Sequence, residues 1–290
     1  MLLFENCTYQ SKTKMKLRSL LFVPGDRPER FKKAINSSTD AVILDLEDSV
    51  TSDKKGCARD AVSNCLSEPR AKPIFIRINP LKSKFIDNDL LAILDHQPDG
   101  IILPKCEGAS NVLDLVKMMS SQTVPILPIA TETPVSIFEI GSLRHVSEHL
   151  CGITWGAEDL PAAIGASASR DPDGSYTSPY EFVRNLSLFA AHAANVLAID
   201  TVFPDIKNQT GLMKYATRGY QDGFKGMMAI HPSQTDIINK AYTPSEIEIA
   251  YARKVIDAFS NNKCSGAIQL DGQMLDAPHL KQAQHCLSLL

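Results

Sequence analysis

The sequence predicts an α/β protein, namely a (β/α)₈ barrel followed by a C-terminal extension. From Leu17 onward, short and nearly continuous apolar runs alternate with longer stretches in which apolar residues recur every three or four positions, which is typical of βα units. Eight such runs occur within roughly 220 residues, and eight strand–helix repeats are what a barrel of this kind requires.

The apolar runs are expected to be parallel strands. Parallel strands are covered by helices on both faces, so they lack the alternation of apolar and polar residues that a solvated antiparallel sheet shows. The eight expected strands are residues 18–24, 40–46, 72–78, 99–105, 124–130, 150–156, 197–203 and 224–230.

The segments between the runs have the residue spacing of amphipathic helices, and Pro28 opens the first of them. The clearest expected helices are residues 28–36, 88–96, 110–119, 134–143, 180–195 and 210–220. A doubly wound open sheet is the alternative fold. It usually has fewer strands and begins with a glycine-rich phosphate turn, and the sequence contains neither GxGxxG nor a P-loop motif.

The two ends of the chain lie outside the expected barrel, which covers residues 17–243. Residues 1–16 form a leader that we expect to be poorly ordered. Residues 244–290 exceed what barrel closure needs, and they contain a long amphipathic helix and a strand–turn–helix pattern. Such an extension can cap the barrel or reach another subunit, and we expect it to contact a neighbouring subunit.

Composition and charge favour a cytoplasmic enzyme and exclude other classes. The 290 residues are 44% hydrophobic, which suffices for a large core, and no apolar run reaches the ~18 residues of a membrane span. The net charge of −3 gives no global attraction to nucleic acid or anionic membranes. Seven scattered cysteines without zinc spacing indicate reduced thiols. Basic residues before Arg18 leave an organellar transit peptide as an alternative, against which Glu5 counts.

Polar side chains stand at the ends of the expected strands, where (β/α)₈ barrels place their active sites. They are Asp45, Glu47, Asp48, Arg77, Asn79, Lys105, Thr131, Glu132, Glu158, Asp159, Asp205 and His231. So many carboxylates would repel one another without a cation, and oxygen ligands without cysteine or paired histidines select Mg²⁺. The rigid guanidinium of Arg77 suits a substrate carboxylate.

Each of these residues also has a purely structural interpretation. A carboxylate after a strand is often a helix cap or a loop ion pair, and Asp48 could cap the following helix. Lys105 suits either a second cation of the site or an ion-pair partner of Glu47. A lone histidine before proline, such as His231, is more often structural than catalytic. Trp155 is expected to pack against the rim rather than to stack on a ligand.

Eight segments, taken in order, resemble the citrate lyase β subunit-like acyl-CoA lyases of the HpcH/HpaI type. They are LRSLLFVPGDRPERF, DAVILDLEDSV, FIRINP, GIILPK, ATET, WGAEDL, AIDTVF and LDGQMLDAP. Each alone is weak, but the combination runs from about Leu17 to the C-terminus and is specific. The resemblance implies a TIM barrel that binds Mg²⁺, or Mn²⁺ in its place, and cleaves 3-hydroxyacyl-CoA thioesters.

The resemblance also implies roles for individual residues. Glu132 in ATET and Asp159 in GAED correspond to the metal ligands, and Arg77 in RIN corresponds to the arginine that binds the substrate carboxylate. Thr131 departs from the family pattern, which commonly has an aliphatic residue before the glutamate. The remaining substrate-binding positions, which form the keto-acid cradle with Glu132, are Gly156, Ala157 and Glu158.

Further positions are implied for catalysis and coenzyme A. Glu47, with its neighbour Asp48, resembles an acidic pair that orders metal-bound water, and we count Glu47 among the catalytic residues. Asp276 in LDAP resembles the aspartate that stand-alone acyl-CoA lyases supply to an adjacent subunit, although Asp271 lies close by. Pro24 in FVPG resembles the entrance on the coenzyme A side. Apart from the resemblance, basic residues near the first loop, Arg27 and Lys32 among them, are expected to contact the phosphates of coenzyme A, with a solvated helix face as the alternative.

We therefore expect a carbon–carbon lyase that cleaves (S)-citramalyl-CoA to acetyl-CoA and pyruvate, in a homotrimer or hexamer. A malyl-CoA lyase and a citrate lyase β subunit are the alternatives, although the GDRPERF segment and the long tail resemble the stand-alone enzymes. A non-catalytic subunit that binds a CoA thioester or keto acid would be expected to lose Glu132, Asp159 or Arg77, and all three are present. A sugar-phosphate aldolase would need a glycine cluster that the last two strands lack.

Overall fold

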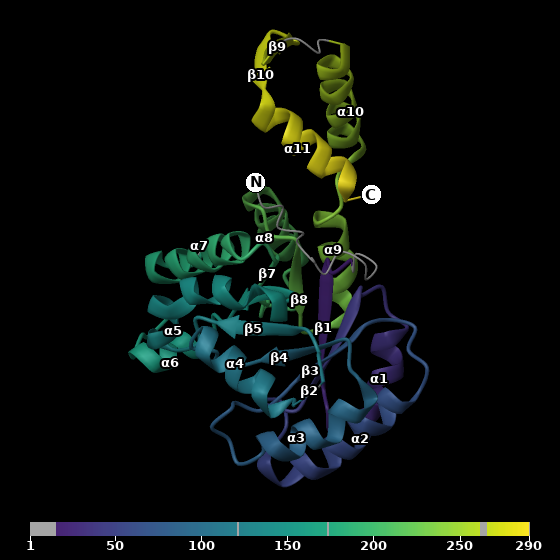
Figure 1. The fold of residues 1–290 in the computed structure, drawn as a ribbon, viewed down its shortest axis with the longest axis vertical. Helices are drawn as coiled ribbons and strands as arrows, with labels where there is room; N and C mark the ends of the chain where they lie inside the picture. The colour runs from purple at the N-terminus through teal and green to yellow at the C-terminus, as the bar shows by residue number, and fades with distance from the viewer. Residues whose placement is uncertain (1–15, 121, 173, 262–265, 290) are drawn as a thin grey trace, which may run out of the picture. The chain divides into compact units, whose positions relative to one another are not determined.

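Eight parallel strands close into a barrel in sequential order, and β8 pairs with β1 to complete it (Figure 1). The computed structural model describes residues 16–120, 122–172, 174–261 and 266–289. The predicted TIM barrel is confirmed, because each expected apolar run contains one strand. The strands are β1 (Ser19–Pro24), β2 (Ala41–Asp45), β3 (Ile74–Arg77), β4 (Gly100–Leu103), β5 (Ile126–Ala130), β6 (Gly152–Trp155), β7 (Leu197–Asp200) and β8 (Gly226–Ala229).

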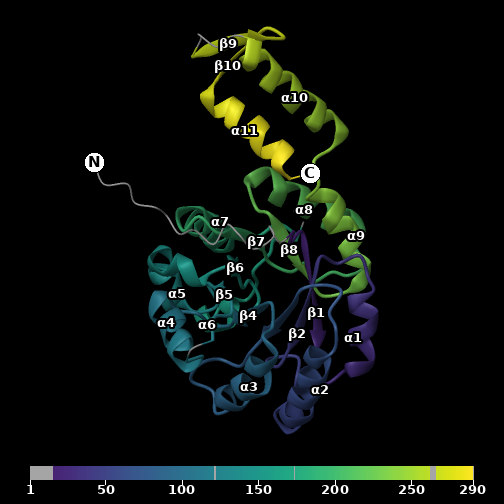
Figure 2. The same ribbon diagram turned by 45° about the vertical axis from the view of Figure 1, so that its right-hand side comes forward.

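Helices follow the strands and surround the barrel (Figure 2). They are α1 (Pro28–Ile35), α2 (Lys55–Ser67), α3 (Ile86–Ile93), α4 (Ala109–Met118), α5 (Pro134–Glu139), α6 (Asp159–Ile164), α7 (Ser178–Ala193), α8 (Gln209–Asp222) and α9 (Pro232–Ala241). Three short 3₁₀ segments, η1 (Ser52–Lys54), η2 (Leu94–His96) and η3 (Ile140–His149), adjoin α2, α3 and α5. The helix expected over 134–143 is therefore an α-helix only to Glu139. Among the described residues, no helix combines the length and apolar character that a bilayer crossing requires.

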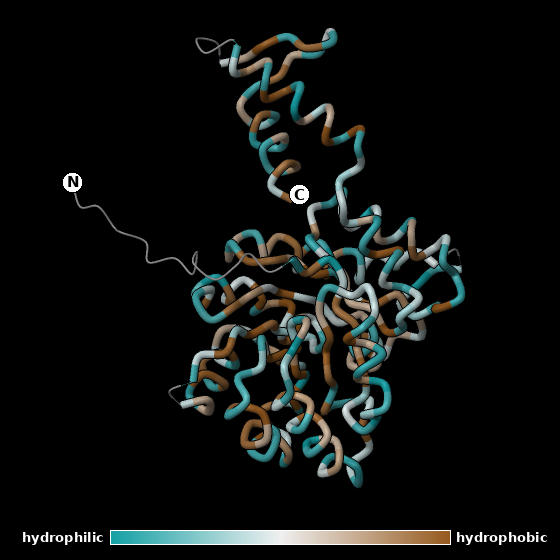
Figure 3. The backbone as a smooth tube through the Cα atoms, turned by 90° about the vertical axis from the view of Figure 1, so that its right-hand side faces the viewer, coloured by the Kyte–Doolittle hydropathy of each residue, from teal (hydrophilic) through white to brown (hydrophobic). Residues whose placement is uncertain are grey.

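The barrel interior is filled by side chains from most of the strands, and the hydropathy of the strands reflects this (Figure 3). Successive inward positions on β2 are Ala41 and Ile43, and the next in that alternation is Asp45. On β3, Phe75 lies in the same core and Arg77 follows two residues later. Every second residue on these strands points into the core, so the same alternation places the Asp45 carboxylate and the Arg77 guanidinium at the carboxyl end of the barrel.

Two glycines at the other end of the strands permit close packing. A Cβ atom on Gly226 would lie 1.9 Å from the carbonyl oxygen of Leu17, and one on Gly100 would lie 2.2 Å from the ring of Phe75. Both distances are far below van der Waals contact, so only glycine fits without backbone movement. Phe75 can therefore occupy the centre of the barrel beneath the rim residues.

The chain divides into two compact units, Met1–Asn239 and Lys240–Leu290. In the second unit, α10 (Glu246–Asn261) and α11 (Ala277–Ser288) lie side by side. Ser245 caps α10 through a reciprocal pair of hydrogen bonds with Glu248. The unit has its own small core of Ala252, Val255, Ile268, Leu275 and Ala283.

The second unit contains one strand more than the predicted strand–turn–helix pattern. Strands β9 (Ala267–Leu270) and β10 (Gln273–Asp276) form an antiparallel hairpin. Asp271 and Gly272 connect them with φ values of 49° and 81°, as a type I′ turn requires. The Asp-Gly pair was the available signal for this hairpin. The expected leader falls almost wholly within residues 1–15, outside the described part of the chain.

Candidate active site at the carboxyl ends of the barrel strands

The centre of the rim is a buried ion pair between adjacent strands. Asp45 and Arg77 end β2 and β3 and are in register with each other. Arg77 donates from Nε to Oδ1 and from Nη2 to Oδ2 of Asp45, both at 2.7 Å. Burial would raise the pKa of Asp45, but the hydrogen bonds and charge of Arg77 outweigh burial and hold that pKa below its ordinary value. Arg77 also lies over the ring of Phe22, with 4.8 Å between Cζ and the ring centroid.

Glu47 connects this ion pair to Lys105 at the end of the next strand, β4. Its Oε1 accepts a hydrogen bond from Lys105 Nζ at 2.8 Å. Of the two interpretations of Lys105 drawn from the sequence, the structure therefore shows the ion-pair partner of Glu47. Its Oε2 lies 3.1 Å from Arg77 Nη1, but among the described residues no donor is aligned to form a hydrogen bond with it. Burial raises the pKa of Glu47 despite both cations. Oε2 of Glu47 is thus a buried acceptor that has an ionic contact with Arg77 but no hydrogen bond from the described residues.

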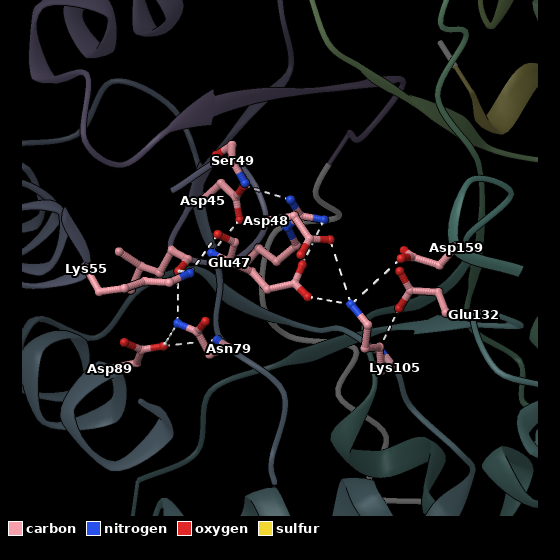
Figure 4. Close-up of polar contacts among 12 residues, drawn as sticks. Asp45, Glu47, Asp48, Ser49, Lys55, Asn79, Asp89, Lys105, Glu132 and Asp159 are labelled. Atoms are coloured by element: carbon pink, nitrogen blue, oxygen red, sulfur yellow. Dashed lines mark hydrogen bonds and ion pairs between the residues drawn. The ribbon is translucent and has the colours of Figure 1, made fainter. Parts of the chain in front are cut away.

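Glu132 and Asp159, at the ends of β5 and β6, face each other (Figure 4). The backbone N–H of Lys105 donates to Oε2 of Glu132, and the ammonium of Lys105 lies 3.9 Å from Asp159 Oδ1. Glu132 is buried, and desolvation with the adjacent Asp159 raises its pKa well above the ordinary value. A Cβ on Gly156 would lie 2.4 Å from Cγ of Glu132, so glycine is needed where β6 passes this side chain.

The backbone at this rim is strained. Lys105 and Thr131 have φ values of 51° and 69°, in the left-handed region that residues with a Cβ rarely adopt. For a β-branched residue such as Thr131 this conformation costs about 1–3 kcal/mol. Thr131 is buried, and its hydroxyl lies 3.4 Å from the carbonyl of Gly156, to which it donates. Strain of this kind is typical of residues that hold a functional group, here Glu132, in a fixed direction.

The charges at the rim suit a divalent cation. Five carboxylates outnumber the two cations among them; these residues are Asp45, Glu47, Asp48, Glu132, Asp159, Arg77 and Lys105 (Figure 4). Arg77 and Lys105 neutralise Asp45 and Glu47. Glu132 and Asp159 remain as a pair of carboxylates that share no hydrogen-bonded cation among the described residues. Within the described ranges, no cluster of three or more His, Cys, Asp or Glu side chains could hold a metal. Mg²⁺ is typically held by one or two protein carboxylates and keeps several waters, so this pair of carboxylates matches it.

Several predicted residues do not join this cluster. Asp205 is exposed and accepts a hydrogen bond from the backbone of Lys207, and His231 is exposed with Nδ1 2.8 Å from Ser233 Oγ. Both therefore have the structural roles that loop residues commonly have. Trp155 is fully buried, as expected, and donates a hydrogen bond to Asp200.

The predicted binding residues around the rim differ in exposure. Ala157 is buried, Gly156 is half-buried, and Glu158 is exposed at the N-cap of α6. Arg27 and Lys32 are exposed on the first loop and on α1, close in sequence to the half-buried Pro24.

Asp276 belongs to the second unit, where it precedes α11 and its Oδ1 lies 2.6 Å from Nδ1 of His279. Sequence reasoning missed two residues that support the rim from behind, Lys55 and Asp89: Lys55 binds the carbonyl of Leu46, and Asp89 accepts hydrogen bonds from Asn79. A lysine or aspartate inside a helix gives no sign of burial in a single sequence.

Known proteins resemble this chain along almost its whole length. The family model described as HpcH/HpaI aldolase/citrate lyase matches residues 18–232. A citrate lyase subunit beta-like protein from Mycobacterium tuberculosis is 38% identical over 267 residues, which cover 92% of this chain and 93% of that protein. Citrate lyase subunit beta of Escherichia coli K12 is 34% identical, with coverages of 96% and 94%. Human mitochondrial citramalyl-CoA lyase is 28% identical, with coverages of 94% and 85%.

A solved structure shows the same fold. The M. tuberculosis protein CitE, crystallised with magnesium, acetoacetate and coenzyme A, superposes with a TM-score of 0.81 at 35% identity, covering 94% of this chain and 97% of that one.

Proposed function

Because the chain belongs to the HpcH/HpaI aldolase/citrate lyase family, we propose that it is a magnesium-dependent carbon–carbon lyase that cleaves a 3-hydroxyacyl-CoA thioester, with citramalyl-CoA as the substrate. The products are acetyl-CoA and pyruvate. The observation that carries this proposal is the facing pair of Glu132 and Asp159 beside Lys105, because it combines a site for a hard cation with fixed positive charge.

The reaction needs a held 2-hydroxy acid, removal of its hydroxyl proton and stabilisation of the departing thioester enolate. Glu132 and Asp159 would hold the Mg²⁺ ion, which when bound polarises the oxygens of the hydroxy acid. Arg77 has N–H groups beyond those that bind Asp45, and its charge stabilises the carboxylate of the substrate. The buried Oε2 of Glu47 is the available acceptor for the hydroxyl proton.

The electron flow follows from these positions. When the hydroxyl proton leaves, its electron pair forms the carbonyl of pyruvate, and the adjacent carbon–carbon bond breaks toward the thioester. Lys105 keeps Glu47 oriented through the 2.8 Å hydrogen bond. Exposed Arg27 and Lys32 are proposed to contact the phosphates of coenzyme A at the first loop, and Pro24 is proposed to lie at the entrance on that side. The keto-acid end is proposed to rest against the backbone of Gly156, Ala157 and Glu158.

Incubation of the purified protein with citramalyl-, malyl- and citryl-CoA tests the substrate assignment. We expect release of acetyl-CoA to be fastest from citramalyl-CoA, with pyruvate formed in equal amount, and to stop when EDTA removes Mg²⁺. Cleavage of a citryl group only when a partner protein carries it would identify a citrate lyase β subunit instead, as the E. coli relative suggests. No cleavage of any thioester with Mg²⁺ present would favour a binding subunit.

Asp276 is proposed to protonate the enolate carbon in the active site of an adjacent subunit of a trimer or hexamer. Co-expression of two differently tagged chains, one with Asp276→Ala and one with Glu132→Ala, tests this role. Each variant alone should be inactive, whereas purified hybrid oligomers should regain part of the activity because some sites combine an intact Glu132 with an intact Asp276. Inactive hybrids, or the absence of any oligomer, would contradict the proposal.

A further inference from the structure

Lys55 is a buried lysine without a carboxylate partner. It is the first residue of α2, it is only 5% exposed, and no ion pair joins it to the described carboxylates. Its Nζ donates instead to the backbone carbonyls of Leu46 and Glu47, both at 2.7 Å. Desolvation lowers its pKa, against the attraction of nearby carboxylates. Burial of an ammonium group costs folding free energy, so its retention here calls for a local reason.

The two carbonyls lie in the loop that carries Glu47. Leu46 continues the ladder by donating its N–H to the carbonyl of Arg77, and beyond it the chain leaves the barrel. On the side that faces the site, Asp45 accepts hydrogen bonds from the N–H groups of Glu47 and Ser49, at 2.9 and 3.1 Å. On the other side, Lys55 binds the carbonyls. The backbone of Glu47 is thus fixed at its N–H and at its C=O.

A second layer of side chains supports the same loop. Asn79 donates from Nδ2 to the carbonyl of Leu46 at 2.8 Å and to Asp89 Oδ2 at 2.6 Å. Asp89 is fully buried and also accepts from Arg59. Figure 4 shows Lys55, Asn79 and Asp89 on one side of Glu47, and Lys105, Glu132 and Asp159 on the other.

We propose that Lys55 is a positioning residue of this site: its ammonium fixes the carbonyls of Leu46 and Glu47, and thereby the direction in which the Glu47 carboxylate faces Arg77 and Lys105. The inference rests on the proposed function, in which Glu47 acts on the substrate. A shift of about 1 Å in a reacting group costs up to ~100-fold in rate. Loss of Lys55 therefore acts on turnover through Glu47, and leaves the pair Glu132 and Asp159 unchanged.

The test is a double-mutant cycle with Lys55→Met and Glu47→Gln. We expect Lys55→Met to lower kcat about 10- to 100-fold while KM for the thioester and Mg²⁺ binding, measured by calorimetry, stay within about twofold of the parent. In the Glu47→Gln background, Lys55→Met should lower kcat by less than about twofold more, because the group that it orients is already inactive. Without Lys55, the carbonyl of Leu46 still accepts from Asn79 and the carbonyl of Glu47 still accepts from the N–H of Val50, so the Lys55→Met protein should fold.

Lys84→Met is the matched control. Lys84 is exposed and its Nζ lies 5.2 Å from the centroid of the Phe85 ring, the same ring that Lys55 approaches to 5.6 Å, but it does not bind the loop carbonyls. It should retain parental kcat. Should Lys55→Met fail to fold, Lys55→Gln, which keeps one donor for a carbonyl, replaces it in the cycle.

The outcomes separate the two hypotheses. Full activity of Glu47→Gln would refute the role of Glu47 in the proposed function. An inactive Glu47→Gln with an unchanged kcat in Lys55→Met would refute the positioning role alone. Equal loss from Lys55→Met in both backgrounds would also refute it, since this would show a general structural effect.

Discussion

Replacement of Glu132 by alanine should abolish Mg²⁺-dependent turnover. Removal of a group that merely orients a metal ligand costs about 10- to 100-fold in metal affinity or activity, so loss of a ligand should exceed that. We expect kcat/KM to fall by more than about 100-fold and the calorimetric signal of Mg²⁺ binding to disappear. Asp159→Ala should behave in the same way, because Asp159 faces Glu132 at the rim.

A second measurement distinguishes lost metal binding from misfolding. Glu132 is buried against another carboxylate, so Glu132→Gln removes electrostatic repulsion from the metal-free protein. Its thermal midpoint without Mg²⁺ should equal or exceed that of the parent, whereas only the parent should gain stability on addition of Mg²⁺. Asp205→Ala, at an exposed carboxylate after β7, is the control and should be fully active. Normal turnover in either ligand variant would overturn the assignment.

The sequence allowed prediction of the rim because the parallel barrel brings the carboxyl ends of all its strands together. Arg77, Lys105, Glu132 and Asp159 come from four different strands, and their proximity followed from the fold alone. Their pairing followed only in part: the ion pair of Lys105 with Glu47 was one of two interpretations of the sequence. Arg77 was expected to suit a substrate carboxylate, and its anchoring by Asp45, which lies on the same interior face of the barrel, was not predicted. Register and rotamers determine such pairs, and neither is visible in a list of strand ends.

An error of three residues in the predicted end of β7 led to the wrong rim carboxylate. The run over 197–203 was taken as one strand, so Asp205 was examined as its rim residue. The strand ends at Asp200, inside the apolar run, and this aspartate is fully buried. A carboxylate within an apolar run is a signal that a buried cation lies opposite, because an unpaired charge would not be tolerated there. The partner, Arg184, lies on α7, where a long basic side chain normally indicates a solvated face.

Removal of Asp200 should be the most destabilising of the single substitutions considered. Arg184 and Asp200 are both fully buried, and Nη2 of Arg184 lies 2.7 Å from Oδ2 of Asp200. Oδ1 of Asp200 accepts hydrogen bonds from Trp155 and from Tyr215, at 2.7 and 2.8 Å. Burial opposes the charge of Arg184, yet the attraction of Asp200 raises its pKa overall. Asp200→Ala leaves this cation with Asp222, which is partly exposed, and removes the acceptor of the buried Trp155 and the half-buried Tyr215.

A broken buried ion pair costs about 3–5 kcal/mol, which for a chain of this size lowers the thermal midpoint by on the order of 10 °C. Arg218→Ala, which removes a half-exposed arginine paired with Glu181 and, at 3.6 Å, with Asp222, should cost less than about 1 kcal/mol in the same unfolding experiment. The combination of Arg184→Met with Asp200→Ala should cost less than the sum of the two single changes, because neither charge is then left unpaired. Additive costs would show that Trp155 and Tyr215, rather than the ion pair, account for the stability.

Asp200→Ala should also reduce turnover at temperatures below unfolding. Trp155, which donates a hydrogen bond to Asp200, directly precedes Gly156, so loss of this bond should loosen the chain that leads to Asp159.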